Sequence, residues 1–592
     1  MCGIFGYVGA RQDAPELVLH GLKQLEYRGY DSWGIAVARN GHVDVEKRTG
    51  KIGQARTSLP PSSIGLGHTR WATHGGVTDA NAHPHLDCTG RLAIIHNGIV
   101  QNHRDLRLEL RERGHQFKSE TDTEVVAHLL EEQLEAAPDG RDRLARAMMA
   151  TFRRLEGLNA VAALDIRTRH LAAAKSGSPL TLGWSPDGNM LASDYSALLE
   201  HTRRMTFLDE NQAALLTPEG ISVYDALTGR EIEPTVTVVE WSAEQADLQG
   251  YPDFMSKEIH EQPGVLRRIA RERLADAGTL AELIHEAAEA HLVGCGTAAH
   301  AALAGQYLLA RIAGHRAFFA NGSEFGYLER FLGPGALAVA FSQSGETIDI
   351  LDSMRAAKAR GAKLAAAVNV EGSSLYRLAD HAVLLGAGPE RCVLATKSFT
   401  AKLAIMLLTS HALVGRVEQG AELLERAADE IKALLSDWRR DHIREAAEEI
   451  YRREHLYVIG RGPSYPQALE AALKIKEVSY IHAEGFAGGE LKHGVIALIE
   501  PGTPCLVLAP NDETRDDILS GAMEVKARGA YIIGIGPEAD DAFDCHIPAG
   551  DVGEASGIVQ AVPGQMLAYY LALLRGHDPD KPRNLAKSVT VK

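Results

Sequence analysis

The sequence lacks the features that mark secreted, membrane-spanning and metal-binding proteins. Its six cysteines lie far apart, without a CxxC pair or a pairing pattern, which predicts a reduced, cytoplasmic protein. No uninterrupted apolar run approaches the ~18 residues of a membrane span. The first residues lack the basic segment and apolar core of a signal peptide. No HExxH or Cys/His ligand spacing occurs among the 25 histidines, so we expect no metal.

Positive charge is scarce relative to negative charge. The net charge of −16 argues against nucleic acid or an anionic membrane as the main partner, although a local basic pocket would be compatible with it. The remaining composition is that of a globular protein, with 45% hydrophobic and 24% charged residues among 592. At ~100–200 residues per domain, the chain has room for roughly three or four domains.

The pattern of elements changes along the chain. Residues 1–238 contain short β-type runs such as GIAVARN and RLAIIHNGIV with two helical stretches, which predicts an α+β layered domain. Residues 239–256 are polar and aperiodic, and we interpret them as a linker. Strands and helices then alternate, which predicts doubly wound α/β units with parallel sheets.

The second half of the chain repeats itself. HLVGCGTAAHAALAGQYLL, from His291, resembles HLYVIGRGPSYPQALEAAL, from His455, and the word KARGA recurs at a similar offset. Chance similarity between amphipathic helices is the alternative explanation. We interpret the pattern as two copies of one α/β domain, at 285–430 and 450–575, followed by a C-terminal tail at 576–592 outside both copies.

Cys2 is the first chemical signal. Removal of Met1 would leave this cysteine with a free α-amino group, whose ordinary pKa of about 7.7–8.0 lets it act as a base near neutral pH. A nucleophile that uses its own terminal amine as base is one solution for cleaving amides. The alternatives are a small buried residue at the start of a strand, or a lipidated cysteine.

Three residues in two later motifs offer complementary groups. Arg70 in HTRWATHG presents a guanidinium that suits bidentate binding of a carboxylate, with a surface ion pair as the alternative. In HNG, Asn97 can donate its side-chain amide, and Gly98 allows close approach to a backbone N–H. Such a pair of donors is what an oxyanion hole needs.

Acidic and imidazole groups lie nearby in the sequence. Asp122 in SETDTEV precedes a predicted helix, where it could bind a ligand or simply cap the helix N-terminus. His83 and His85 in NAHPH are interpreted as structural hydrogen-bonding residues rather than ligands.

The first part of the chain contains, in this order, the motifs CGIFGYVG, LEYRGYDSWG, HTRWATHG, NAHPH, HNGIVQNH and SETDTEV. This series resembles the glutaminase domain of class II glutamine amidotransferases. The resemblance implies an αββα fold of the N-terminal-nucleophile type. It implies Cys2 as nucleophile with its amine as base, and Asn97 and Gly98 as the oxyanion hole. The implied glutamine-binding residues are Arg70 for the carboxylate, Asp122 for the amino group, and Trp71, Thr73 and His74 lining the pocket. Trp33 replaces a small residue of the family, and its bulk is expected to affect a loop near the pocket.

The first α/β copy contains a candidate anion site. The apolar run ALAVAF leads into Ser342-Gln343-Ser344-Gly345-Glu346-Thr347 and then a helix, which places hydroxyls and free N–H groups at a helix N-terminus. The loop has no lysine, so it favours a monophosphate over a nucleotide; an ordinary capped turn is the alternative. The second copy has APNDETRDD at this place, where Asp512 would repel an anion.

The second copy contains candidate acid–base groups. Glu470, Lys474 and Glu477 are spaced four and three residues apart, so they share one helix face. A surface ion-pair ladder is one interpretation. The other is proton transfer during ring opening and isomerisation of a sugar phosphate, together with His493 in ELKHG.

The second half of the chain carries a further set of motifs: CGT, NGSEF, FSQSGET, LATKSFT, ALKIKEVSYIHAE, GELKHG and PRNLAKSVTV. Together they resemble the tandem sugar-isomerase (SIS) domains of the glutamine–fructose-6-phosphate aminotransferase family. The resemblance implies Thr297 near the sugar, Glu477 as the base between carbons 1 and 2, His493 in ring opening and Lys587 as Schiff-base lysine. It implies phosphate contacts from Ser342, Gln343, Ser344 and Thr347. Ala298 and Ala395 replace serines that are frequent in the family, which removes two possible substrate hydroxyls and is expected to raise the KM at most.

The sequence therefore predicts an enzyme that hydrolyses L-glutamine, passes ammonia internally and aminates fructose 6-phosphate to glucosamine 6-phosphate. Trp71 is a candidate gate for the ammonia, and no cofactor is expected. A homodimer is expected from the resemblance alone. The alternatives are an amidotransferase or deglycase acting on another ketose phosphate, and a non-catalytic sugar-phosphate-binding regulator. The joint presence of Cys2, Glu477, His493 and Lys587 favours an enzyme over a regulator.

Overall fold

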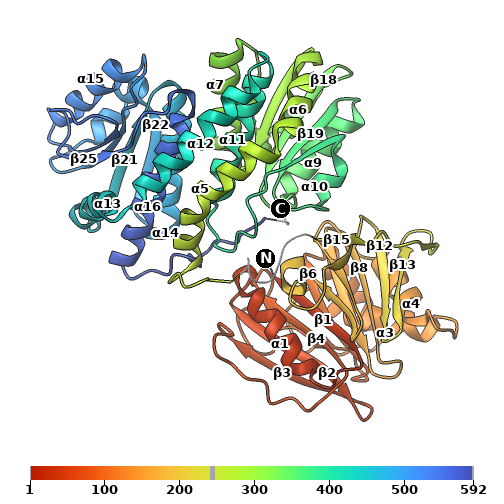
Figure 1. Ribbon diagram of the computed structural model, residues 1–592. Helices are drawn as coiled ribbons and strands as arrows, with labels where there is room; N and C mark the ends of the chain where they lie inside the picture. Colours follow the sequence, from red (N-terminus) through yellow and green to blue (C-terminus); the bar gives the residue numbers. More distant parts are fainter. Residues whose placement is uncertain (1, 240–246, 590–592) are drawn as a thin grey trace. The chain divides into compact units, whose positions relative to one another are not determined.

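The computed structural model describes residues 2–239 and 247–589. It consists of two compact units (Figure 1), Met1–Asp247 with Ala586–Lys592, and Leu248–Leu585. Each unit has its own sheets and hydrophobic core, so each is described by itself.

The first unit contains two antiparallel sheets. The eight-stranded sheet has the order β15-β11-β9-β10-β1-β4-β2-β3, with β1 (Gly3–Gly9), β2 (Ser32–Arg39), β3 (His42–Thr49), β4 (Ile64–Arg70), β9 (Thr181–Ser185), β10 (Gly188–Ala192), β11 (Arg204–Phe207) and β15 (Thr237–Val238). The seven-stranded sheet has the order β14-β13-β12-β8-β7-β6-β5, with β5 (His85–Leu86), β6 (Leu92–Gly98), β7 (Asn159–Asp165), β8 (His170–Ser176), β12 (Gln212–Thr217), β13 (Gly220–Asp225) and β14 (Glu231–Ile232).

Alternation along β6 shows how the layers of the first unit are built. Ala93 and Ile95 belong to the core between the two sheets, whereas Leu92 and Ile94 face the core beneath the helices. The helices on that side are α2 (His103–Glu112), α3 (Glu124–Ala136) and α4 (Arg143–Phe152), and α1 (Ala14–Gln24) packs on β1, β2 and β4 of the other sheet. The αββα layering expected for this unit is therefore confirmed.

The second unit contains two parallel five-stranded sheets with the orders β17-β16-β18-β19-β20 and β22-β21-β23-β24-β25. Numbered within each sheet, both follow the order 2-1-3-4-5, which confirms the doubly wound class and supports the internal repeat. The strands are β16 (Glu289–Gly294), β17 (Phe318–Asn321), β18 (Ala336–Ser342), β19 (Lys363–Val368), β20 (His381–Leu384), β21 (His455–Gly460), β22 (His482–Ala487), β23 (Pro504–Leu508), β24 (Tyr531–Gly536) and β25 (Cys545–Pro548).

Helices surround both sheets of the second unit (Figure 1). They are α5 (Phe254–Glu272), α6 (Leu274–Glu286), α7 (Thr297–Leu308), α8 (Gly322–Phe325), α9 (Ile348–Ala359), α10 (Ser374–Leu378), α11 (Lys397–Ala412), α12 (Val417–Leu434), α13 (Asp437–Ile450), α14 (Tyr465–Ser479), α15 (Arg515–Lys526) and α16 (Ser556–Leu574). One continuous hydrophobic core joins residues of both copies. The two copies therefore form one unit rather than separate bodies.

The predicted linker at 239–256 overlaps the start of a helix. Helix α5 begins at Phe254, because Asp253 caps it by accepting a hydrogen bond from the backbone N–H of Ser256 at 2.8 Å. Tyr569 donates a further hydrogen bond to the Asp253 carboxylate at 3.0 Å. Residues 240–246 of the predicted linker lie outside the described residues.

Among the described residues, one helical segment, Gly553–Leu574, is long and apolar enough to cross a membrane, and 78% of its most apolar window is buried. It contains α16, which packs against α14 and α13. The segment escapes a search for uninterrupted apolar runs because glycine, glutamine and proline interrupt it. Its burial is that of a core helix.

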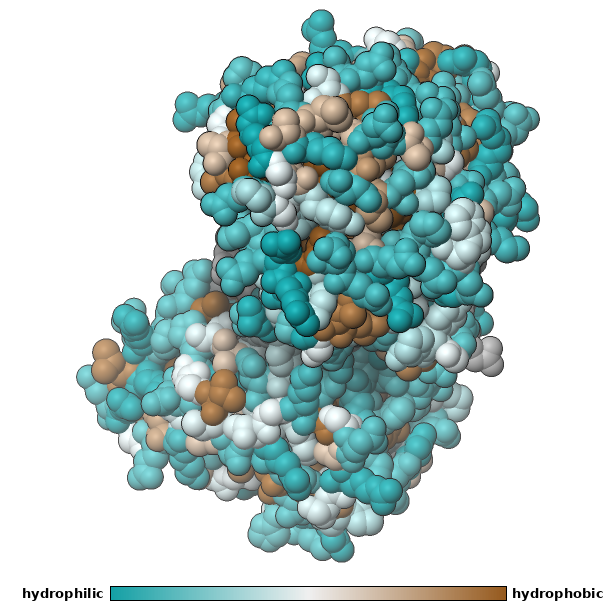
Figure 2. Space-filling model, turned by 90° about the vertical axis from the view of Figure 1, so that its left-hand side faces the viewer, coloured by the Kyte–Doolittle hydropathy of each residue, from teal (hydrophilic) through white to brown (hydrophobic). Residues whose placement is uncertain are grey.

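The exposed surface is mainly hydrophilic on the face shown in Figure 2, where hydrophobic side chains form scattered small groups. Large hydrophobic residues that are exposed include Tyr327 and Phe331 after α8, and Leu498 after β22. Scattered apolar side chains of this kind are ordinary on protein surfaces.

Candidate functional site

The Cys2 thiol lies beside the end of β4. Strand β1 pairs with β4 so that Gly3 is opposite Thr69, which brings half-buried Cys2 next to Trp71 just beyond that strand. The backbone N–H of Trp71 donates to Sγ at 3.1 Å, and the thiol lies 3.6 Å from the Trp71 carbonyl oxygen. Burial raises the pKa of the Cys2 thiol, so a nucleophilic thiolate requires a nearby base.

Asn97 is held in place by a histidine that the sequence analysis did not single out. The Asn97 side-chain amide donates to the Cys2 carbonyl oxygen at 2.9 Å. His68 Nε2 lies 3.0 Å from both the Asn97 side-chain oxygen and the His96 carbonyl oxygen. Because both neighbours are acceptors, Nε2 carries the proton. Burial lowers the pKa of His68 to about 3, so the ring stays neutral and fixes which end of Asn97 faces Cys2.

Gly98 has a backbone conformation that other residues rarely adopt. Its φ is +126°, and a Cβ atom there would lie 2.1 Å from the Leu158 carbonyl oxygen. A side chain at this position would force the end of β6 away from β7. The structure thus places Asn97 next to Cys2, with a glycine after it that the local backbone requires.

Arg70 and Asp122 are buried, which contradicts the surface alternative for Arg70. The Arg70 guanidinium donates to the carbonyl oxygens of His74 at 2.5 Å and Gly76 at 3.1 Å, and burial lowers its pKa. The Asp122 carboxylate accepts from the backbone N–H of Val100 at 2.8 Å. Helix α3 begins at Glu124, and among the described residues no side chain makes a capping hydrogen bond at its N-terminus. Asp122 is therefore not the capping group of this helix.

The other predicted pocket residues have different environments. Trp71 makes an edge contact with Tyr30 at 5.5 Å between ring centroids, and His74 makes one with His103 at 5.1 Å. Thr73 is exposed. Trp33 is buried within β2, with the Arg48 guanidinium 5.9 Å from its ring, so the sheet rather than a loop accommodates its bulk.

The NAHPH histidines are part of a buried cluster, as expected for structural residues. The His83 ring stacks on His68 at 4.1 Å and meets His85 at 4.9 Å, and the Thr121 hydroxyl is 3.0 Å from His85 Nε2. Burial lowers the pKa values of His68, His83, His85 and His96. These four rings are therefore neutral in the folded protein.

We predict that this cluster makes the first unit acid-labile. Below pH ~6.5 the unfolded chain protonates these histidines while the folded chain does not, so the free energy of unfolding falls as pH falls. His68, with a pKa of about 3, alone contributes a slope of about 1.4 kcal/mol per pH unit in that range. Urea unfolding between about pH 7 and pH 5 measures the slope.

The variant His83→Gln is expected to flatten that slope, because glutamine does not titrate. His42→Gln, at an exposed position of β3, is the matched control. An unchanged slope in His83→Gln would show that the cluster does not govern acid stability.

The candidate phosphate loop lies at the switch point of the first parallel sheet. In the order 2-1-3-4-5, ligands bind beyond the carboxyl ends of strands 1 and 3, which here are β16 and β18. Thr297 follows β16, and Ser342 ends β18. The Ser342 hydroxyl accepts from Gly345 N–H at 3.0 Å, and Ser344 accepts from Glu346 N–H at 3.2 Å.

Helix α9 starts directly after this loop. In the described chain its N-cap residue, Thr347, makes no side-chain capping hydrogen bond, whereas Ser342 and Ser344 cap N–H groups of the turn itself. The N-terminal N–H groups are therefore available to an anion. The Gln343 carbonyl oxygen accepts from Asn369 N–H at 3.2 Å, which ties the loop to the end of β19.

The equivalent loop of the second copy already contains an anion. The Asp512 carboxylate accepts from the backbone N–H of Thr514 at 2.9 Å and pairs with Arg311 at 3.1 Å. This arrangement supports a single phosphate site, in the first copy.

Glu470 and Lys474 are buried, which contradicts the surface-ladder alternative. Each side chain is 1% exposed, and their charged atoms are 3.5 Å apart. Lys474 Nζ also lies 2.6 Å from Glu477, whose side chain is 21% exposed. Burial opposes charge on Lys474, but the carboxylates of Glu477 and Glu470 outweigh it and raise the pKa of the lysine.

Glu470 connects the two copies. Its carboxylate accepts from the Thr297 hydroxyl at 3.0 Å and lies 2.8 Å from His300 Nδ1. Burial would raise the pKa of Glu470, but Lys474 and His300 lower it. The structure therefore joins Thr297, predicted near the sugar, to the carboxylate–lysine row of α14. Ala298, the residue after Thr297, lies in the hydrophobic core.

Two further predicted residues lie on other segments of the chain. His493 ends a short 3-10 segment, Gly488–His493, and is exposed. Lys587 is partly buried and belongs to the first unit. Their roles stay predictions.

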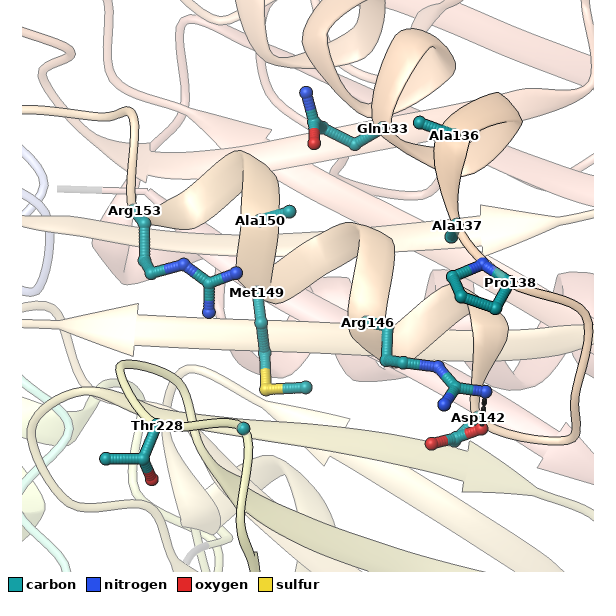
Figure 3. A pocket seen from close by; sticks show the side chains of 11 residues that line it. Gln133, Ala136, Ala137, Pro138, Asp142, Arg146, Met149, Ala150, Arg153 and Thr228 are labelled. Carbon is teal, nitrogen blue, oxygen red and sulfur yellow. Dashed lines mark ion pairs between the residues drawn. The ribbon is translucent and has the colours of Figure 1, made fainter.

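A separate pocket of ≈ 410 Å³ lies between α3, α4 and the loop after β13. Figure 3 shows Arg146 paired with Asp142, with Met149 and Arg153 beside them. None of the predicted site residues lines this pocket.

Comparisons with known proteins match both units. A SIS-domain family model matches residues 283–412 and 449–575, and a glutamine amidotransferase domain model matches residues 68–200. Glutamine–fructose-6-phosphate aminotransferase (isomerizing) of Pyrococcus horikoshii is 41% identical, and that of Thermus thermophilus is 42% identical, each over 100% of both chains.

The structure of the C-terminal domain of the glucosamine–fructose-6-phosphate aminotransferase of Francisella tularensis covers 56% of this chain and 99% of its own, with 33% identity and a TM-score of 0.53. Full-length identity above 40% to two such relatives, together with the two matched domain types, shows the family. The chain belongs to the glutamine–fructose-6-phosphate aminotransferases (isomerizing).

Proposed function

We propose that the protein makes glucosamine 6-phosphate and glutamate from fructose 6-phosphate and L-glutamine. Cys2 attacks the glutamine amide, and its own α-amino group, exposed by loss of Met1, takes the thiol proton. Asn97 and Gly98 stabilise the oxyanion, Arg70 and Asp122 hold the two ends of glutamine, and Trp71, Thr73 and His74 line the pocket. The released ammonia reaches the sugar without equilibrating with solvent.

One observation carries this proposal: a single chain combines an N-terminal cysteine facing an oriented amide donor with a phosphosugar-isomerase tandem. The Cys2–Trp71–Asn97 contacts supply the amide-cleaving half. The loop from Ser342 to Thr347 and the buried Glu470–Lys474 pair supply the sugar half. Ammonia is mostly protonated in neutral water, which makes a shared chain a physical advantage.

The decisive experiment supplies amide-¹⁵N glutamine and fructose 6-phosphate together with excess unlabelled ammonium, and measures the isotope in the amino sugar by mass spectrometry. We expect glucosamine 6-phosphate that carries ¹⁵N. A panel of other ketose phosphates tests the alternative substrates, and added glucosamine 6-phosphate tests the deglycase direction. Glutamate formation without any amino sugar would disprove the proposal.

In the isomerase half, Ser342, Gln343, Ser344 and Thr347 hold the phosphate and Thr297 lies near the sugar. Glu477 moves a proton between carbons 1 and 2, with the Lys474 ammonium 2.6 Å from it and Glu470 fixing that lysine. His493 acts in ring opening, and Lys587 forms the imine with the ketone.

We predict that Lys587→Arg stops amino-sugar synthesis and leaves glutamine hydrolysis measurable. Arginine keeps the positive charge but does not form the imine. Lys581→Arg, in the same C-terminal stretch, is the control and should retain activity within about twofold. Glucosamine 6-phosphate formed by Lys587→Arg at a normal rate would remove this lysine from the mechanism.

The proposal includes a homodimer in the cytoplasm. None of the six cysteines, all of which the structure describes, forms a disulfide, in keeping with a reducing environment. Light scattering should give twice the 63.9 kDa mass of the chain, and a monomer mass at working concentration would contradict the dimer.

A further inference from the structure

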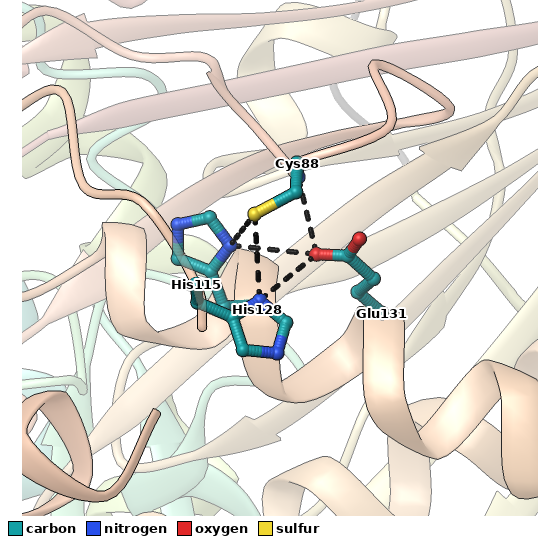
Figure 4. A group of neighbouring side chains, drawn as sticks. All are labelled: Cys88, His115, His128 and Glu131. Atoms are coloured by element: carbon teal, nitrogen blue, oxygen red, sulfur yellow. Dashed lines mark hydrogen bonds and ion pairs between the residues drawn. The ribbon is translucent and has the colours of Figure 1, made fainter. Parts of the chain in front are cut away.

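Four side chains with metal-binding atoms meet in the first unit, away from the glutamine site. Figure 4 shows Cys88, His115, His128 and Glu131 directed at one another. Cys88 lies between β5 and β6, His115 between α2 and α3, and the other two on α3. None of them has a part in the proposed reaction.

The distances between their ligand atoms fit a tetrahedron around one metal ion. Cys88 Sγ lies 3.5 Å from His115 Nδ1 and 3.4 Å from His128 Nδ1. Glu131 Oε2 lies 3.2 Å from the first of these nitrogens and 3.4 Å from the second. Tetrahedral Zn²⁺ with its usual bond lengths requires about 3.6 Å between sulfur and nitrogen and about 3.4 Å between nitrogen and oxygen.

Hydrogen bonding explains the two His–Glu131 distances less well. Good N–H···O hydrogen bonds measure ~2.9–3.0 Å, whereas both His–Glu131 distances are longer. All four ligand atoms lie within 4.8 Å of one another. The four atoms therefore share a common centre, and Glu131 Oε2 also accepts from the Cys88 backbone N–H at 3.1 Å.

The outer nitrogens of both histidines face carboxylates. His115 Nε2 is 3.3 Å from Glu132, and His128 Nε2 is 3.9 Å from Glu124. A ligating histidine usually directs its second ring nitrogen to a carboxylate or carbonyl; here a carboxylate lies on that side of each ring, and His128 Nε2 makes no hydrogen bond among the described residues. This second layer is independent of the four ligand distances.

We propose that Cys88, His115, His128 and Glu131 bind one Zn²⁺ ion. A thiolate and a carboxylate balance the charge of the ion, and two neutral imidazoles complete the coordination. With four protein ligands the site is closed, so its role is structural. The ion would join the loop before β6 to helix α3. Strand β6 carries Asn97, and α3 begins just after Asp122.

This inference revises the expectation of no metal. That expectation rested on the absence of closely spaced ligand motifs. Here 26 residues separate the first two ligands and 12 the next two, and only the fold brings them together.

The test uses the full-length protein and Zn²⁺ alone. Purified protein, dialysed against metal-free buffer, should retain about one zinc per chain by elemental analysis. Cys88→Ser and His128→Gln should lose most of it, whereas Cys545→Ser, which changes a cysteine elsewhere, should keep it. Replacement of zinc by Co²⁺ should give tetrahedral visible bands and a thiolate charge-transfer band that Cys88→Ser lacks.

A strong zinc chelator should also lower the thermal midpoint of the first unit by at least about 5 °C in the wild type and not in Cys88→Ser. This readout does not depend on glutaminase activity. Wild-type protein with about 0.1 zinc or less per chain after saturation with Zn²⁺ and dialysis would overturn the site. Equal binding by Cys88→Ser would also overturn it.

Discussion

Replacement of Cys2 by alanine is expected to reduce glutamine hydrolysis by at least about 10³-fold, because it removes the thiol that attacks the amide. The Trp71 backbone N–H donates a hydrogen bond to Cys2 Sγ at 3.1 Å, and the Asn97 side-chain amide donates one to the Cys2 carbonyl oxygen. Glutamate release from glutamine is the measurement. Glucosamine 6-phosphate formation from glutamine should disappear with it.

The isomerase half serves as the internal control for Cys2→Ala. Slow conversion of fructose 6-phosphate to glucose 6-phosphate should persist, because the phosphate loop and the Glu477 base proposed for it belong to the second unit, which has its own core. Cys545→Ser is the matched cysteine control. Retained glutaminase activity in Cys2→Ala would refute the assignment of the nucleophile.

Replacement of Lys474 by methionine is expected to lower the free energy of unfolding of the second unit by about 3–5 kcal/mol, because it leaves buried carboxylates without their cation. Lys474 and Glu470 are both 1% exposed, and Glu477 lies 2.6 Å from the same ammonium. Isomerisation should fall with stability, whereas glutamine hydrolysis by the first unit should change little. Chemical unfolding followed by a second-unit probe measures the effect.

Lys476→Met is the matched control, since Lys476 lies on the same helix and is exposed. It should change stability by less than about 0.5 kcal/mol. Lys474 lowers the pKa of Glu470, so its loss makes this carboxylate easier to protonate. The destabilisation should therefore shrink as pH falls. Equal effects of the two lysine variants would show that the buried row contributes no net stability.

The layers of both units could be predicted from the sequence because periodicity and repetition are local signals. The uninterrupted apolar run of Leu92, Ala93, Ile94 and Ile95 indicates a strand buried on both faces. Similarly, the repeated motifs after β16 and β21 encode two copies with the same strand order. The cap of α5, Asp253, lies inside the predicted linker, and its role depends on the backbone N–H of Ser256.

The parts of the site that escaped prediction depend on contacts between distant segments. In the sequence, His68 is simply the first residue of HTRWATHG. Its role follows from its hydrogen bond to Asn97, which lies on a strand of the other sheet. The burial of Glu470 follows from its hydrogen bond to Thr297 in the other copy. Spacing along a helix shows which residues share a face, but not what covers that face.

The identical strand order of the two copies has an evolutionary consequence. If the domain existed as a separate chain, two copies of it would form a symmetric homodimer. Every substitution in the gene would then appear in both subunits. Joining the copies covalently removes that constraint, so Asp512 can fill one loop while Ser342 and Ser344 remain in the other. Fusion thus permits one half to keep a loop of small hydroxyl residues while the other contributes the buried carboxylate–lysine row of α14.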